Sequence, residues 1–373
     1  MKDKIKITFV ISGVDYSLGF LWLSKYIDTT KYDSSFIFLS KSSPALLQIL
    51  RSKGIKSTFL PCRNKFDYFK IFLRLIVKFV KDKPDIVHAH LLEAGLISLA
   101  AARIAFIKKR IYTRHHATYN RIYYPHMVKF DKFINTIATH IIAISNNVAE
   151  VLIKSENVPP SKVVVIPHGF EFENFIHINK TSSALLREKY NNRGKRPVIG
   201  VISRFIELKG LQYIIPAFER ILKTQPDALL IMANASGDYS NTINDLLSKL
   251  PSDSYIKIEF ERDLFSLYSI FDYFIHAPID PSVEAFGQVY IEALAAGIPS
   301  IFTLSGIAPD FIVDEKNALV VPFQNSEAIY SALKRLCENN SLKEKLVLQG
   351  REDVLNLFSF EKSLLKMYSI YEG

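Results

Sequence analysis

Short apolar runs alternate with amphipathic segments along most of the chain. Residues 5–12 (IKITFVIS) form one continuous apolar run, and Gly13 separates them from an apolar, helix-like segment near 18–27. A buried strand, a glycine turn and a helix, in this order, open a doubly wound α/β domain. Further strands are predicted at 35–39, 57–60, 84–90 and 110–113, and a strand followed by a helix at 140–152. The pattern therefore predicts a mostly parallel sheet covered by helices.

The same pattern starts again after residue 196. A buried strand is predicted at 199–202, and Lys209-Gly210 leads from its loop into a helix. Near the end of this half, residues 288–296 have the apolar stripe of a helix, which Gly297 and Pro299 stop. The short run at 300–303 (SIFT) is partly β-branched and predicts a buried strand. A second α/β domain is therefore expected.

Between the two patterns the chain becomes polar. Residues 177–196 show a poor hydrophobic pattern, which predicts an interdomain linker. We expect a first domain over residues 1–175 and a second over 190–355, with a helical tail over 356–373.

One predicted helix of the first half combines apolar and basic residues. Residues 63–83 (RNKFDYFKIFLRLIVKFVKDK) carry a strong apolar face and seven positive charges. A basic amphipathic helix suits the headgroups of an anionic membrane. A helix that packs on the core and leaves a solvated basic side would have the same pattern, and the sequence leaves both interpretations open.

Composition limits the class of protein. With 49% hydrophobic and 23% charged residues, the 373-residue chain is typical of a globular protein with two domains. No run of 18 uncharged apolar residues occurs, and the amino-terminal sequence enters a strand without the apolar core of a signal peptide. Cys62 and Cys337 form no ligand-spaced cluster, so neither a disulfide framework nor a structural zinc is expected. We expect a cytoplasmic protein.

The net charge of +10 is unevenly distributed. Residues 1–170 have 26 Lys and Arg against 11 Asp and Glu, whereas residues 171–373 have 21 against 26. The first half is therefore expected to meet an anionic partner, such as phosphates, lipid headgroups or nucleic acid.

Two carboxylates of the second half mark a candidate site. Glu284 and Glu292 lie eight positions apart in PSVEAFGQVYIEALAAGIPSIFT (281–303), with Glu284 before the predicted helix and Glu292 within it. At about 1.5 Å of rise per residue, the two can contact two ends of one elongated ligand. The free N–H groups at the start of this helix would suit phosphates. Two solvated glutamates on a surface helix are the alternative.

This segment resembles the glutamate-pair signature of family 4 glycosyltransferases, which are retaining enzymes. A second segment, GVISRFIELKG (200–210), resembles the diphosphate clamp of the same family. The resemblance implies that Arg204 and Lys209 bind the diphosphate, that Glu284 contacts donor-sugar hydroxyls, and that Glu292 binds the ribose. Cations near a diphosphate stabilise the charge that develops as the glycosidic bond breaks. Other donor-binding residues implied are Gly13, Ser203, Arg262, Phe286 and Gly287.

In the first half the resemblance extends to segments at the ends of two predicted strands. PDIVHAH (84–90) and Thr113-Arg114-His115 resemble family segments, and His115 is implied to lie near the reacting sugar. His116 takes this place if the register is one residue off. The implied catalytic residues are His115, Arg204, Lys209 and Glu284, and the implied acceptor-side residues are Tyr16, His90, His116, Tyr119 and Arg121. His168 stands where the family usually has Asn, and residues 233–236 lack its G-x-G-like turn.

The resemblance covers essentially the whole chain and implies a GT-B fold, an α/β architecture in which two Rossmann-like doubly wound domains face each other across a cleft. The tail would return to the first domain. The implied reaction is transfer of a hexosyl or N-acetylhexosaminyl group from a nucleoside-diphosphate sugar to an acceptor hydroxyl, with retention at the anomeric carbon. No D-x-D motif is present, so we expect neither a metal nor another cofactor.

Charge and family habit favour a saccharide or lipid-linked saccharide acceptor in bacterial cell-envelope polysaccharide or glycolipid synthesis. The enzyme would then be peripheral at the inner face of the plasma membrane. Two alternatives remain at this point. Another GT-B enzyme, such as a nucleotide-sugar epimerase, would have the same fold, and a nucleic-acid-binding protein would explain the basic half. No nucleic-acid motif is recognised, so no nucleic-acid partner is expected.

Overall fold

The computed structural model describes residues 4–373, apart from the side chain of Lys65. These residues form two compact units, which are described separately. The first comprises the chain up to Phe170 together with Phe360–Gly373, and the second comprises Glu171–Ser359. The chain therefore leaves the first unit once and returns to it for its last helix.

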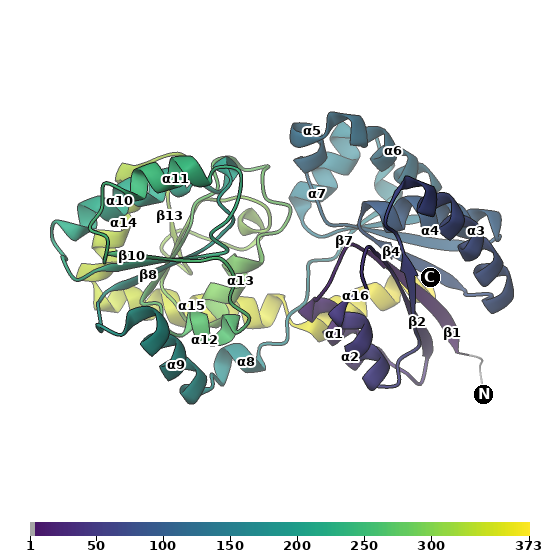
Figure 1. Cartoon of the computed structure of the whole chain (residues 1–373), viewed down its shortest axis with the longest axis horizontal. Coiled ribbons are helices and arrows are strands. Elements are labelled where there is room, and N and C mark those ends of the chain that lie inside the picture. Colours follow the sequence, from purple (N-terminus) through teal and green to yellow (C-terminus); the bar gives the residue numbers. More distant parts are fainter. Residues whose placement is uncertain (1–3) are drawn as a thin grey trace. The chain divides into compact units, whose positions relative to one another are not determined.

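The first unit is built on a seven-stranded parallel sheet with strand order β3-β2-β1-β4-β5-β6-β7. Its central strands are almost entirely buried because helices cover both faces (Figure 1). The strands are β1 (Ile5–Ser12), β2 (Tyr32–Ser40), β3 (Ser57–Pro61), β4 (Ile86–His90), β5 (Lys109–Arg114), β6 (His140–Ala143) and β7 (Val163–Val165).

Helices α1 (Leu18–Tyr26), α2 (Ala45–Ser52) and α16 (Phe360–Glu372) lie on one face of this sheet, and α3 (Lys65–Asp82), α4 (Leu92–Ile104) and α6 (Val128–Ile137) lie on the other (Figure 1). Two short helices, α5 (Tyr119–Tyr123) and α7 (Asn146–Glu150), follow β5 and β6. The Ser145 side chain accepts a hydrogen bond from the Val148 N–H and so caps α7.

The last helix, α16, is held in the first unit by polar contacts as well as by packing. The Tyr371 hydroxyl lies 2.8 Å from Nδ1 of His88, and Lys109 Nζ donates to the carbonyls of Ile370 and Tyr371 at 3.0 Å. A Cβ at Gly169 would lie 2.7 Å from the Cα of Phe360, so only glycine permits this close approach. The final segment therefore completes the first unit.

The second unit has a six-stranded parallel sheet with strand order β10-β9-β8-β11-β12-β13. Helices again cover both faces (Figure 1). The strands are β8 (Val198–Ile202), β9 (Leu229–Ala233), β10 (Tyr255–Ile258), β11 (Tyr273–His276), β12 (Ser300–Phe302) and β13 (Leu319–Val320), and the helices are α8 (Glu173–Ile176), α9 (Lys180–Asn191), α10 (Leu211–Leu222), α11 (Ser240–Leu247), α12 (Leu264–Tyr268), α13 (Gln288–Ala295), α14 (Ser326–Glu338) and α15 (Asn340–Leu357).

The prediction of a linker over residues 177–196 is wrong, because most of this segment is helix α9. Asn179 caps the helix by accepting hydrogen bonds from the N–H groups of Thr181 and Ser182. Leu186 is the one buried residue of α9, and Ser183 contacts Ser269 at 2.7 Å between their hydroxyls. A helix with a single buried position has no hydrophobic periodicity for a sequence pattern to detect.

Both sheets reverse their strand order at one place. In the first unit this switch point lies between β1 and β4, and in the second between β8 and β11. In open parallel sheets, ligands bind beyond the carboxyl ends of the strands at such a point. The loops that follow β1, β4, β8 and β11 are therefore the places to look for chemistry.

Candidate active site

In the second unit, the loop after β8 carries the two cations predicted to form a diphosphate clamp. Ser203 is buried and its N–H bonds the Ala233 carbonyl at 2.9 Å, which fixes the start of the loop. Gly210 ends the loop at φ 73°, and a Cβ there would lie 1.9 Å from the carbonyl oxygen of Ala277. This glycine therefore allows the β8 loop to contact the end of β11, on the other side of the switch point.

Glu284 lies against this contact and receives two hydrogen bonds on one oxygen. Its Oε1 pairs with Lys209 Nζ and accepts from Nε2 of His276 at 3.0 Å. Its backbone N–H donates to the Ser305 hydroxyl at 3.2 Å. The structure therefore brings Lys209 and Glu284 together, although 74 residues separate them in the sequence.

The charges of this cluster determine its protonation. Burial by itself would raise the pKa of Glu284, but the charge of Lys209 and the hydrogen bond from His276 outweigh it and hold that pKa well below its usual range. Burial lowers the pKa of His276, despite its contact with Glu284. At neutral pH Glu284 is thus a carboxylate and His276 a neutral imidazole.

The start of α13 is shaped by glycine. Gly287 precedes the helix at φ 81°, and a Cβ there would lie 2.6 Å from the Tyr290 ring. Phe286 is buried beside it, and its carbonyl accepts a hydrogen bond from the Ile307 N–H at 2.9 Å. The first turn of α13 holds no acidic residue, so no carboxylate of its own occupies the positive end of the helix dipole.

Glu292, on α13, has a different environment from Glu284. Its Oε2 accepts a hydrogen bond from the Tyr268 hydroxyl at 2.8 Å. Burial raises the pKa of Glu292 to about 7, an effect that the hydrogen bond from Tyr268 only partly opposes. This carboxyl group is therefore partly protonated at neutral pH and is suited to exchange hydrogen bonds with hydroxyl groups.

The remaining predicted donor residues are exposed. Arg204 follows Ser203 on the β8 loop, and its guanidinium forms no ion pair with any residue that the structure describes. Arg262 is also exposed and follows β10, two strands away from β8 in the sheet. Arg204 thus shares a loop with Lys209, whereas Arg262 forms no ion pair with the Glu284 cluster among the residues that the structure describes.

In the first unit, Gly13 and Tyr16 follow β1. Gly13 has φ 64°, and no heavy atom lies within 4 Å of the place a Cβ would take. The left-handed backbone by itself therefore favours glycine at this position. The Tyr16 side chain is exposed.

Four histidines gather at the carboxyl ends of β4 and β5. His90 Nδ1 lies 3.1 Å from Nε2 of His115, and the rings of His115 and His168 are stacked with centroids 5.3 Å apart. His88 lies behind them, with its Nε2 2.7 Å from the Thr113 hydroxyl. The register explains the cluster, because His90 is paired with Thr113 on the neighbouring strand.

Burial makes these imidazoles weak bases. It lowers the pKa of His90 and of His115 well below the usual value, and it lowers the pKa of His168 to about 4 and that of His88 to about 3. At neutral pH, His115 is therefore an uncharged hydrogen-bonding group.

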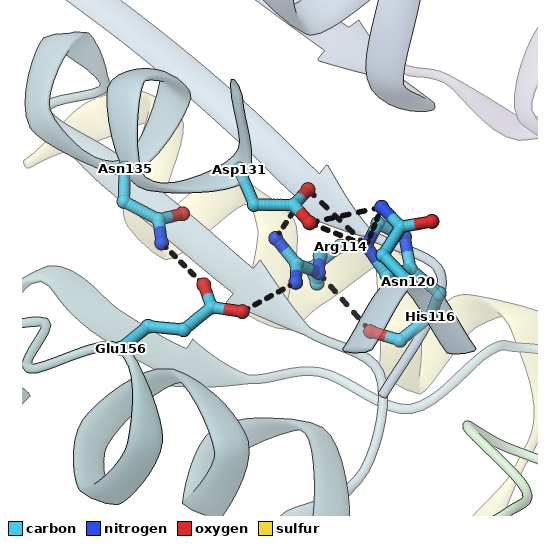
Figure 2. A network of polar contacts seen from close by, with 6 residues as sticks. All are labelled: Arg114, His116, Asn120, Asp131, Asn135 and Glu156. Carbon is cyan, nitrogen blue, oxygen red and sulfur yellow. Dashed lines mark hydrogen bonds and ion pairs between the residues drawn. The ribbon is translucent and has the colours of Figure 1, made fainter. Parts of the chain in front are cut away.

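The neighbouring polar residues form a separate buried network, which Figure 2 shows. Arg114 is 1% exposed and pairs with Asp131 at 2.8 Å and with Glu156 at 2.7 Å. Its Nε also donates to the His116 carbonyl at 3.1 Å. The network consists of Arg114, His116, Asn120, Asp131, Asn135 and Glu156.

His116, predicted on the acceptor side, thus has a partner inside the protein. Its Nε2 lies 3.3 Å from Oδ2 of Asp131, to which Asn120 also donates at 2.9 Å. Tyr119 and Arg121 are exposed on α5, and the Tyr119 ring contacts the ring of Tyr123 at a centroid distance of 5.0 Å.

Sequence reasoning missed three residues of these sites. His276 and Tyr268 lie in segments whose pattern indicates only a buried strand and a helix, and nothing in the sequence connects them with Glu284 and Glu292. His168 did leave a signal, because it replaces the family's usual Asn, and the structure places it against His115.

Comparisons with known proteins cover nearly the whole chain. Residues 182–353 match the family model of "Glycosyl transferases group 1", and residues 23–174 match that of "Glycosyltransferase Family 4". The capsular polysaccharide biosynthesis glycosyltransferase CapM of Staphylococcus aureus is 29% identical over 315 residues, which are 82% of this chain and 81% of CapM. The Escherichia coli UDP-Gal:alpha-D-GlcNAc-diphosphoundecaprenol alpha-1,3-galactosyltransferase is 24% identical over 85% of this chain and 84% of its own.

Solved structures have the same fold. A glycosyltransferase from Rickettsia africae superposes with a TM-score of 0.81 at 23% identity and covers 99% of this chain and 98% of its own. HepE from Anabaena, in complex with UDP-glucose, superposes with a TM-score of 0.81 at 17% identity, over 98% of this chain and 99% of HepE. At this level of identity the likeness shows the fold.

Proposed function

Because the chain belongs to the group 1, family 4 glycosyltransferases and has their GT-B fold, we propose that it transfers a sugar from a nucleoside diphosphate to an acceptor hydroxyl with retention at the anomeric carbon. The observation that carries this proposal is the Lys209–Glu284–His276 cluster at the switch point of the second unit. The family models are of glycosyltransferases, so neither the epimerase nor the nucleic-acid-binding interpretation is favoured.

The two cations of the β8 loop would bind the donor diphosphate. The exposed guanidinium of Arg204 is available to phosphate oxygens, and Lys209 is held by Glu284. When the glycosidic bond breaks, the departing diphosphate gains negative charge, which these cations stabilise more strongly in the transition state than in the ground state. The N–H groups at the start of α13 would add to this stabilisation.

The two glutamates would bind opposite ends of the donor. Glu284, a carboxylate beside Lys209, would accept hydrogen bonds from hydroxyls of the donor sugar, with the backbone of Phe286 and Gly287 nearby. Glu292, with its raised pKa, would bind the ribose hydroxyls. We assign no covalent nucleophile, because the leaving group is already a diphosphate and Glu284 is engaged by two partners.

His115 would hydrogen-bond the reacting sugar as a neutral imidazole held by His90 and His168. The transferred group would be a hexosyl or N-acetylhexosaminyl residue. We also propose that no metal takes part, because Arg204 and Lys209 supply the positive charge that Mg²⁺ supplies in other enzymes. Among residues 4–373, no group of three or more His, Cys, Asp or Glu side chains is arranged to hold a metal ion.

We propose a saccharide or lipid-linked saccharide acceptor and a role in bacterial cell-envelope polysaccharide or glycolipid synthesis. The names of two relatives support this, since one is a capsular polysaccharide enzyme and the other acts on a diphosphoundecaprenol-linked sugar. Across the described chain, no helix is both long and apolar enough to cross a bilayer. We propose that the enzyme acts at the inner face of the plasma membrane.

The test is a thermal-shift screen against UDP, GDP, ADP and their sugar conjugates, with and without EDTA, followed by a transfer assay with the nucleotide that binds. A ligand at about 100 times its dissociation constant adds roughly 2.7 kcal/mol to the free energy of unfolding. We expect one nucleotide to raise the melting temperature, with no effect of EDTA. A shift that EDTA removes would contradict the metal-free proposal, and the absence of any shift would contradict the diphosphate site.

A further inference from the structure

Helix α3 carries an apolar stripe that faces away from the protein. Five side chains with 47–83% exposure lie three or four positions apart, and so on one side of the helix. This outer stripe of α3 consists of Phe66, Phe69, Leu73, Val77 and Val80. At about 1.5 Å per residue it extends for about 21 Å.

The outer stripe is not needed to attach α3 to its domain. Ile71, Leu75 and Phe79 are at most 2% exposed and anchor the helix on the opposite side. Asn64 and Asp67 cap its first turn through reciprocal hydrogen bonds. The fold is thus complete without the five outer side chains, and exposed apolar stripes of this extent mark a surface that binds something.

A basic stripe accompanies the apolar one. Lys70, Arg74 and Lys81 lie along α3 beside the outer stripe, and none of them forms an ion pair with a residue of the described chain. Lys78, which lies nearer the core side, is paired with Asp82 at 2.7 Å. The helix therefore presents apolar side chains and free positive charge together.

The turn after the neighbouring helix adds to this surface. Helix α3 packs against α4 (Figure 1). Strand β4 follows α3 and strand β5 follows α4, and these two strands are adjacent and parallel. Both helices therefore end near the amino-terminal ends of these strands. At the end of α4, Phe106 is 91% exposed and has φ 58°, a backbone conformation that favours glycine. A large apolar side chain at such a position indicates a use for it in binding.

We infer that the outer stripe of α3, with Phe106, inserts into the headgroup region of an anionic bilayer while Lys70, Arg74 and Lys81 bind the lipid phosphates. A helix with one apolar and one basic face lies in the plane of a membrane surface in this way. A second copy of the chain is a poorer partner, because an α3-to-α3 contact would bring two basic stripes together. The inference rests on the proposed function in one respect: a lipid-linked acceptor would be reached at the membrane surface that α3 contacts.

The test is flotation of the full chain with vesicles of phosphatidylcholine alone and of phosphatidylcholine mixed with phosphatidylglycerol. We expect binding to the mixed vesicles, weakened by salt. The variant Phe69→Glu/Val77→Glu should lose this binding, and each of Lys70→Ala, Arg74→Ala and Lys81→Ala should weaken it roughly fivefold. Matched controls are Leu348→Glu and Lys249→Ala, at exposed positions of the second unit, which should bind as the unaltered chain does.

Three results would overturn the inference. These are no binding of the unaltered chain to mixed vesicles, unchanged binding of Phe69→Glu/Val77→Glu, or a concentration-dependent dimer in analytical ultracentrifugation that this variant abolishes. Far-UV circular dichroism of Phe69→Glu/Val77→Glu is measured to test that this variant is folded. Nucleotide binding is measured on the same samples, and a chain that binds vesicles but no nucleotide would overturn the proposed function and leave the membrane surface standing.

Discussion

At the scale of single residues, the guanidinium of Arg204 and the ammonium of Lys209 have different environments. Lys209 is held by Glu284, which also accepts a hydrogen bond from His276. Arg204 is exposed and forms no ion pair within the described chain, so a bound diphosphate would be its partner. In the proposed mechanism, Lys209 would thus be positioned before the donor binds, whereas Arg204 would be available to it.

Replacing Arg204 with Ala is expected to lower the rate of sugar transfer by roughly two to three orders of magnitude, because one cation that stabilises the leaving group is lost. The melting temperature without nucleotide should not change, since the side chain makes no ion pair in the described structure. Steady-state transfer assays measure the loss, and Arg193→Ala, at an exposed arginine of the same unit, is the control. Transfer near the unaltered rate would remove Arg204 from the mechanism.

The raised pKa of Glu292 predicts a pH effect on stability. Its pKa is about 7 in the folded protein and 4.5 as the ordinary value, so between these pH values the folded state binds more protons than the unfolded state. The free energy of unfolding should therefore fall as pH rises from 4.5 to 7. In Glu292→Gln this contribution is absent. As the pH rises from 5 to 8, the free energy of unfolding of the variant should therefore increase by on the order of 1 to 3 kcal/mol relative to that of the unaltered chain.

Urea denaturation at the two pH values measures this difference, with Glu259→Gln, at an exposed glutamate, as the control. A constant difference between Glu292→Gln and the unaltered chain would show that Glu292 titrates normally. Because Glu292 is proposed to bind ribose, nucleotide affinity should fall in the same variant.

At the scale of elements, the buried Arg114 network connects β5 with α6 and with the helical segment Val151–Ser155 and its neighbour Glu156 (Figure 2). The Arg114 guanidinium pairs with two carboxylates, those of Asp131 and Glu156, and all three side chains are buried. Burial by itself would raise the pKa of Asp131, but the hydrogen bond from His116 and the charge of Arg114 outweigh it and lower that pKa. The network therefore fixes α6 and Glu156 against the end of β5, the strand that directly precedes His115.

Removing this cation should destabilise the first unit strongly. Arg114→Met leaves two buried carboxylates without their cation, which is expected to cost about 3–5 kcal/mol of the free energy of unfolding. Combining it with Asp131→Asn and Glu156→Gln should restore part of that loss, because the remaining buried groups are then neutral. Chemical denaturation measures both variants, and an equal loss in the two would contradict the electrostatic explanation.

The sequence predicts regular elements well and the environments of polar residues less well. Strand β1 and helix α13 were predicted almost to the residue, because an apolar run or stripe and a glycine stop define them. His116 was predicted on the acceptor side, but Asp131 and Glu156, the buried partners of the neighbouring Arg114, come from later elements, so the burial of this network was not visible. Helix α9 was missed because only Leu186 of it is buried.

At the scale of the whole molecule, the GT-B fold predicted from two glycosyltransferase motifs is confirmed. The recurring strand–turn–helix pattern in both halves was sufficient to predict two α/β domains, since each sheet is parallel and covered on both faces. The contribution of α16 to the first unit was implied by the family resemblance and not by the pattern, because a helical tail has no local signal for its partner.

Ending the chain after Ser359 is expected to destabilise the first unit and not the second. The truncation removes the Tyr371 hydroxyl from His88 and uncovers apolar side chains such as Trp22, which packs on Phe360. Calorimetry of the truncated chain should show a lower melting temperature for the first unit, while the second unit still binds nucleotide. An unchanged melting temperature of the first unit would contradict a structural role for α16.

The division of the chain also orders its synthesis. The strands of the first unit leave the ribosome before the second unit is made, yet their covering helix α16 is made only after it. Glu171–Ser359, in contrast, is continuous and is complete before α16 emerges. The domain that is translated second can therefore finish folding before α16 is available to complete the domain that is translated first.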